Sequence, residues 1–140
     1  MARDAYLEHL AKVPIFSHTS TKDLRLVAQS LTEIQVKPGD VLMREGERAT
    51  SFLIVVEGEL EVRRQDHHVA SLGPGEVVGE MAILMDRHRS ATVVATTDAL
   101  VLVGERRSFE ALLEDVPGLA HKVLVSLAHR VADNERDLLH

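Results

Sequence analysis

The middle of this chain holds short stretches of aliphatic and β-branched residues separated by glycine-containing turns, and this pattern constrains the fold most strongly. About eight such stretches lie between residues 33 and 105. Residues 52–56 are continuously apolar, whereas residues 60–63 alternate between apolar and polar side chains, as a half-buried strand does. Many short strands joined by tight turns predict a mainly β fold, which can be a sandwich, a jelly roll or a small barrel.

Helical patterns precede these strands. Residues 5–13 place Leu7, Leu10 and Ala11 on one stripe, and Pro14 ends that pattern. Ser20 or Thr19 can cap a second helix, with Asp23 in its first turn. The expected buried face of this helix consists of Leu24, Val27, Ala28 and Leu31.

Helical patterns also follow the strands. Ser108 can cap a helix over residues 109–114, and Pro117 can begin a longer helix that runs toward Leu138. The stripe of this long helix is Leu119, Val123, Leu127 and Val131. We therefore expect one domain over residues 1–140, with helices in 1–31, the β core in 32–105 and helices in 106–140.

Composition excludes several classes of function. The chain of 140 residues has no cysteine, which rules out disulfides, thiolate zinc sites and cysteine nucleophiles. Its formal net charge of −6 argues against direct binding of nucleic acid. No apolar run is long enough to span a membrane, and the N-terminus has no signal-peptide core, so we expect a cytoplasmic protein.

Residues 79–93 contain the candidate ligand-binding residues. Gly79 and Glu80 follow a strand, and residues 81–84 can form one helical turn whose free N–H groups suit an anion. Arg89 lies just before the next strand, and a loop that folds back would bring its guanidinium to the same place. A carboxylate repels phosphate, so Glu80 is better explained as an acceptor for sugar hydroxyls. The pattern favours a phosphorylated sugar as ligand.

These residues resemble the phosphate-binding cassette of the cyclic nucleotide-binding domains, the family of catabolite-activator-type regulators, kinase regulatory subunits and cyclic-nucleotide-gated channels. Both halves of the family pattern are present without a gap, Gly79-Glu80-Met81-Ala82-Ile83-Leu84 and Arg89-Ser90-Ala91-Thr92-Val93. Pro38-Gly39-Asp40, residues 52–62 and Leu72-Gly73-Pro74-Gly75-Glu76 also resemble the family. The resemblance implies an eight-stranded, jelly-roll-like β-roll with N-terminal helices and a long C-terminal helix.

The resemblance also implies a role for each cassette residue. Glu80 would bind the ribose 2′-hydroxyl, Arg89 the cyclic phosphate, and Ser90 would donate its hydroxyl to that phosphate. Ala82 and Ala91 would offer backbone N–H groups, Gly79 would admit the sugar, and Met81 lies within the same binding segment. The implied activity is non-catalytic sensing without a metal. His88 departs from the family, which often has proline before the arginine.

The identity of the base is less constrained by the sequence. Aligned from Pro117, the long helix brings Asn134 and Glu135 near the positions that contact the purine in the family. Asparagine can bond an adenine edge in both directions, which favours cAMP, whereas Ser90 also fits cGMP. The long helix would close over the base, and the signal would pass through a homodimer or a separate protein partner. The chain stops at His140, so we expect no helix-turn-helix.

Two other interpretations of the sequence stay open. A degenerate β-roll could serve as an interaction or dimerisation module without a ligand, although such a module has no need for both Glu80 and Arg89. A cupin-type enzyme is a more distant alternative, because the pair His67-His68 lies near an expected hairpin tip without companion ligands. Asp86 and Arg87 are expected to be a solvated loop pair.

Overall fold

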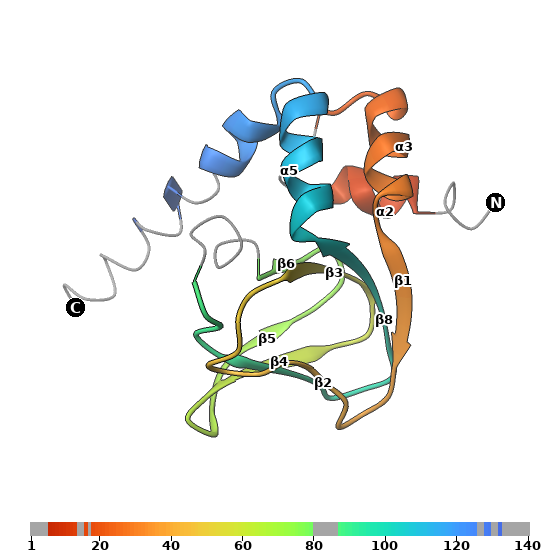
Figure 1. Cartoon of the computed structure of the whole chain (residues 1–140). Helices are drawn as coiled ribbons and strands as arrows, with labels where there is room; N and C mark the ends of the chain where they lie inside the picture. The colour runs from red at the N-terminus through yellow and green to blue at the C-terminus, as the bar shows by residue number, and fades with distance from the viewer. Residues whose placement is uncertain are drawn as a thin grey trace.

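The computed structural model describes residues 6–13, 16, 18–79, 87–125, 128–129 and 132. Eight strands form two four-stranded antiparallel sheets, which together make up a β-roll (Figure 1). The first sheet has the order β1 (Thr32–Val36), β8 (Ala99–Glu105), β3 (Ser51–Glu57) and β6 (Val77–Val78). The second has the order β2 (Val41–Met43), β7 (Thr92–Ala95), β4 (Leu60–Arg64) and β5 (His67–Leu72). The predicted mainly β architecture is confirmed.

Strand β3 explains why residues 52–56 are apolar without interruption. Its side chains alternate between two buried layers. Leu53 and Val55 face the interior of the roll, where they join Leu60, Val93 and Val101. Phe52, Ile54 and Val56 face the opposite side and pack under the helices. A strand covered on both faces loses the alternation that a half-buried strand keeps.

The helices lie on the outer face of the β1-β8-β3-β6 sheet (Figure 1). They are α2 (Leu7–Lys12), α3 (Thr21–Gln29) and α5 (Arg106–Asp115), followed by a helical stretch over residues 119–125. Ser20 caps α3 as predicted, since its Oγ accepts a hydrogen bond of 3.1 Å from the Asp23 N–H. None of the helices in the described part of the chain has the length and hydropathy to cross a bilayer.

Three expectations about helices and turns are wrong in detail. Ser108 does not cap α5, because β8 runs directly into that helix and the extended Glu105 takes the cap position. Ala11 is exposed rather than buried beside Leu10. The next helical stretch begins at Leu119, two residues after Pro117, because Gly118 adopts a left-handed φ of 77° in the preceding turn.

Candidate functional site

The backbone of Arg89 is fixed by the loop that joins β2 to β3. The N–H of Arg89 donates to the carbonyl of Glu47 at 2.7 Å, and the N–H of Gly46 donates to the carbonyl of Arg89 at 2.8 Å. An isolated antiparallel bridge between Arg48 and His88 extends this pairing. The loop therefore sets the direction in which the Arg89 side chain leaves the backbone.

The side chain of Arg89 turns inward, and the residue is only 7% exposed. Its Nη2 donates to the carbonyl and, at 3.5 Å, to the Oγ of Ser51, and its Nη1 donates to the Gly79 carbonyl at 3.3 Å. Burial lowers the pKa of Arg89, and the charge of Glu47 acts in the opposite direction. Within the described residues, these hydrogen bonds of the guanidinium all go to neutral oxygens. A buried cation held in this way is suited to bind an anion.

Gly79 is required at its position for two reasons. Its φ is +93°, in the left-handed region that side chains disfavour. A Cβ atom built there would lie 2.7 Å from Arg89 Nη1 and 2.7 Å from Met43 Cε. Any larger residue would therefore push the guanidinium away from its present place.

The structure brings two of the predicted site residues into contact, Gly79 and Arg89. Ser90 is exposed beside them, and Ala91 is half-buried immediately before β7. The other predicted residues lie outside the described part of the chain, and these are Glu80, Met81, Ala82, Asn134 and Glu135.

The sequence did not indicate the residues that hold Arg89. Ser51 lies far from Arg89 in the chain, and it precedes an apolar run that carries no sign of polar function. Met43 looked like an ordinary strand residue, yet it packs against Gly79. The sequence offered one indication of these contacts, namely the glycines in Glu45-Gly46-Glu47 and at position 79. Glycine permits the close backbone approach on which this site depends.

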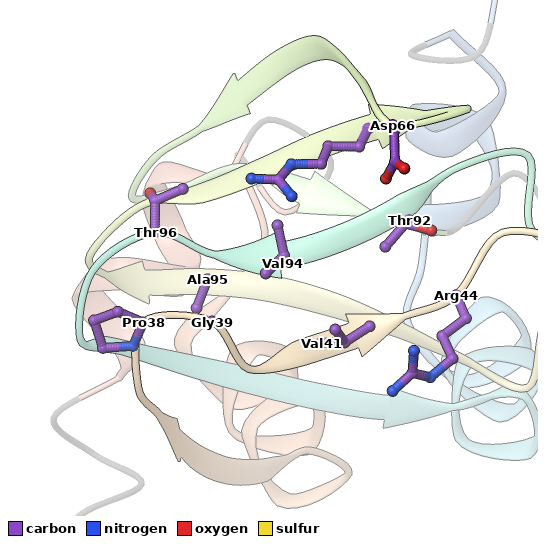
Figure 2. Close-up of a pocket in the computed structure, with 10 residues that line it drawn as sticks. Pro38, Gly39, Val41, Arg44, Asp66, Thr92, Val94, Ala95 and Thr96 are labelled. Carbon is purple, nitrogen blue, oxygen red and sulfur yellow. The ribbon is translucent and has the colours of Figure 1, made fainter.

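A groove of about 560 Å³ lies elsewhere, on the outer face of the β2-β7-β4-β5 sheet (Figure 2). Val41 and Val94 line it together with Arg44 and Arg63. Arg44 faces the carboxylate of Glu47 at 3.8 Å, and Arg63 donates to Glu61. Since both arginines already face carboxylates, we interpret this groove as sheet surface and not as a second anion site.

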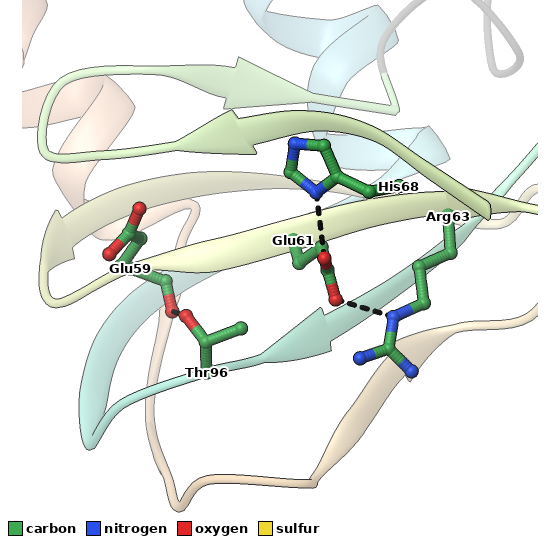
Figure 3. Close-up of polar contacts among 5 residues, drawn as sticks. All are labelled: Glu59, Glu61, Arg63, His68 and Thr96. Atoms are coloured by element: carbon green, nitrogen blue, oxygen red, sulfur yellow. Dashed lines mark hydrogen bonds and ion pairs between the residues drawn. The ribbon is translucent and has the colours of Figure 1, made fainter. Parts of the chain in front are cut away.

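Glu61 joins two strands on the same outer face (Figure 3). Its carboxylate accepts hydrogen bonds from Arg63 Nε and, at 2.7 Å, from His68 Nδ1. The bond from His68, followed by that from Arg63, lowers the pKa of Glu61. The turn of this hairpin is Gln65-Asp66, so the pair His67-His68 begins β5 instead of lying at the tip. The described residues include no group of three or more potential metal ligands.

Comparison with known proteins agrees with the fold. Residues 33–116 match the family model of the cyclic nucleotide-binding domain. This chain belongs to that family. A cAMP-dependent protein kinase regulatory subunit from Hypocrea atroviridis is 32% identical over 138 residues, which cover 99% of this chain and 30% of the relative.

Solved structures of the family have the same fold. The catabolite activator protein of Thermus thermophilus superposes with a TM-score of 0.82 at 31% identity, over 90% of this chain and 62% of that protein. The regulatory subunit of a cAMP-independent protein kinase A from Trypanosoma brucei superposes with a TM-score of 0.79 at 30% identity, over 91% and 46%. The chain thus spans between 30% and 62% of the length of these relatives.

Proposed function

We propose that this chain is a non-catalytic sensor domain that binds a cyclic nucleotide, with cAMP as its preferred ligand. The observation that carries the proposal is the buried guanidinium of Arg89, held by neutral oxygens beside Gly79. A cyclic phosphodiester carries one negative charge, which one arginine together with oriented N–H groups can neutralise. Arg89 would be that cation.

The remaining contacts of the ligand follow from the family pattern. Ser90 would donate its hydroxyl to the phosphate, and the N–H groups of Ala82 and Ala91 would do the same. Glu80 would accept from the ribose 2′-hydroxyl, next to Met81. In this division Arg89 and Glu80 would lie at opposite ends of the ligand. The carboxylate of Glu80 would therefore be kept away from the negative charge of the phosphate.

The C-terminal helix would change its position when the ligand binds. Asn134 and Glu135 would contact the purine as this helix closes, and closure would be a population shift driven by the extra contacts of the closed state. Leu119 and Val123 support this proposal, because they pack the start of the helical segment into the same buried cluster as Phe109 and Leu112 of α5. We further propose a cytoplasmic location and an output through a homodimer or a protein partner, without direct contact to nucleic acid.

The ligand of this chain is a question for measurement, because relatives of similar identity differ in whether their names describe them as cAMP-dependent. The kinase subunit from Hypocrea is named as cAMP-dependent, whereas the Trypanosoma kinase is described as cAMP-independent. Isothermal titration with cAMP, cGMP and linear 5′-AMP separates these cases. We expect heat with cAMP, less with cGMP and none with 5′-AMP. Absence of heat with both cyclic nucleotides at high micromolar concentration would leave the interaction module as the better interpretation.

Thermal melting gives an independent measure of the same binding. A ligand that binds only the folded state at about a hundredfold excess over its Kd stabilises it by roughly 2.7 kcal/mol. For a domain of this size, the midpoint should rise on the order of 10 °C. An unchanged midpoint with cAMP would argue against the proposal.

Gly79→Ala and Gly75→Ala form a matched pair of variants. Both glycines have left-handed φ, +93° at Gly79 and +89° at Gly75, so alanine at either should cost about 1–2 kcal/mol of unfolding free energy. A Cβ at Gly75 meets nothing within 4 Å, whereas at Gly79 it meets Arg89. We therefore expect a loss in urea denaturation that is at least as large for Gly79→Ala as for Gly75→Ala, because Arg89 and Met43 must also shift, and weaker cAMP binding only for Gly79→Ala. Equal affinity of the two variants would show that the guanidinium position is unimportant.

A further inference from the structure

Arg64, the last residue of β4, lies on the face of that strand that points into the roll. Leu60 and Val62 of the same strand pack in the interior cluster of the roll. Residues two apart in a strand point to the same face, so the side chain of Arg64 continues this interior row. A row of two apolar residues thus ends in an exposed cation where the strand ends.

The guanidinium of Arg64 is attached to the residue that follows Arg89. Its Nε donates to the carbonyl of Ser90 at 3.1 Å. Among the described residues, this neutral carbonyl is its hydrogen-bond partner, and no carboxylate is paired with it. Arg63 differs in both respects, because it lies on the outer face and donates to Glu61 (Figure 3). Of these two adjacent arginines, one is neutralised by a contact and the other is not.

The guanidinium of Arg89 lies on the same interior side. A Cβ atom at Gly79 would come within 2.7 Å of both Arg89 Nη1 and Met43 Cε, and Met43 belongs to the interior cluster. Ser90 follows Arg89 directly, and the Cα atoms of neighbouring residues are about 3.8 Å apart. An anion that binds Arg89 and Ser90 therefore lies within about 10 Å of Arg64, the range over which exposed charges act at about 0.1 M salt.

Two carboxylates lie near these arginines and oppose their charge. Glu45 Oε1 accepts a hydrogen bond of 3.0 Å from the N–H of Gln65, the residue after Arg64. The charge of Glu47 acts on Arg89. Neither carboxylate is hydrogen-bonded to the guanidinium of Arg64 or Arg89 within the part of the chain that the structure describes. Each of the two cations is therefore available to an anion.

We propose that Arg64 is a second cation of the anion site, which attracts the phosphate of the ligand electrostatically while Arg89 binds it. The proposal rests on the proposed function, because it adds a residue to the same site. The Ser90 carbonyl holds the Arg64 side chain near the site, and the charge acts without direct contact to the ligand. An exposed cation in this position speeds association and makes the affinity depend on salt.

The first test compares the two adjacent arginines at about 50 mM salt, where screening is weak. We expect the Kd of cAMP to rise roughly four-fold in Arg64→Ala, mainly through slower association in stopped-flow measurements. Arg63→Ala removes the same formal charge from the outer face, where Glu61 already pairs with it, and its Kd should stay within about 1.5-fold of the native value. Equal Kd values for the two variants would overturn the proposal.

The second test separates charge from the hydrogen bond to Ser90. Arg64→Lys keeps the charge and should bind cAMP like the native chain, whereas Arg64→Gln keeps an N–H donor and should bind as weakly as Arg64→Ala. Glu45→Gln removes an opposing charge but keeps an oxygen acceptor for Gln65, so its Kd should fall roughly two-fold. All of these differences should disappear at about 500 mM salt. Weak binding by Arg64→Lys, or differences that persist at high salt, would contradict the proposal.

A measurement with sulfate distinguishes failure of this inference from failure of the proposed function. In ¹⁵N-labelled protein without nucleotide, sulfate at constant ionic strength should shift the Ser90 amide resonance, and it should do so more weakly in Arg64→Ala than in Arg63→Ala. If cAMP binds the native chain and the Arg64 variants equally, only this inference fails. If neither cAMP nor cGMP binds, the proposed function fails, and the sulfate titration decides alone: an absent shift, or one equal in both variants, would overturn the role of Arg64.

Discussion

Replacement of Arg89 by alanine is expected to weaken cAMP binding by roughly 2–5 kcal/mol, because it leaves the phosphate charge unpaired in a buried site. This corresponds to a Kd that rises roughly 30-fold to 5,000-fold. The size follows from the burial of Arg89, a residue that is 7% exposed and so is little screened by bulk water. Isothermal titration gives the Kd of each variant directly.

Arg87→Ala is the matched control for this substitution. Arg87 lies two residues earlier and is exposed, so its removal changes the net charge equally without opening the site. We expect its Kd to stay within two-fold of the native value. Arg89→Lys keeps the charge but cannot reproduce the planar fork that reaches Ser51 and Gly79, and it should fall between the two. Similar affinities of Arg87→Ala and Arg89→Ala would show that the phosphate binds elsewhere.

Phe52→Ala is expected to lower the free energy of unfolding by about 3–5 kcal/mol, the range for deleting a buried aromatic side chain. Phe52 is fully buried, and its ring lies 4.9 Å from that of Phe109 at an angle of 60°. Across the sheet it is paired with Gly104, where a Cβ would come within 2.2 Å of the ring. Phe52, which lies on β3, therefore packs against both β8 and α5.

Urea denaturation measures this loss. Val69→Ala serves as the control, because Val69 is 48% exposed on the outer strand β5 and should change the unfolding free energy by less than about 0.5 kcal/mol. A loss below about 1 kcal/mol in Phe52→Ala would mean that the layer between the sheet and the helices contributes less than its burial indicates.

The strands could be predicted because their determinants are local. Glycine turns separate them, and the period of two in residues 60–63 and the apolar run in 52–56 each follow from how many faces of the strand are buried. The cap at Ser20 was found for the same reason. The start of α5 was misplaced, because the direct continuation of β8 into the helix depends on the Arg106 N–H bonding to the Thr50 carbonyl across the sheet.

The candidate site could be predicted only in part. Gly79 and Arg89 were found from the cassette pattern, and the structure brings them into contact. The groups that hold Arg89 come from Ser51 and from the carbonyl of Glu47, which are distant in the sequence and carry no pattern of their own. The left-handed turn at Gln65 and Asp66 was missed because neither residue favours that conformation, and the bond to Glu45 that supports it is a tertiary contact.

A crystal structure of the chain with cAMP tests the central claim most directly. We predict that an equatorial oxygen of the cyclic phosphate lies within hydrogen-bond distance of the Arg89 guanidinium, with the Ser90 hydroxyl and the Ala91 N–H on the same phosphate. A phosphate found in the outer groove beside Arg44 and Arg63, with Arg89 still bound only to Ser51 and Gly79, would contradict it.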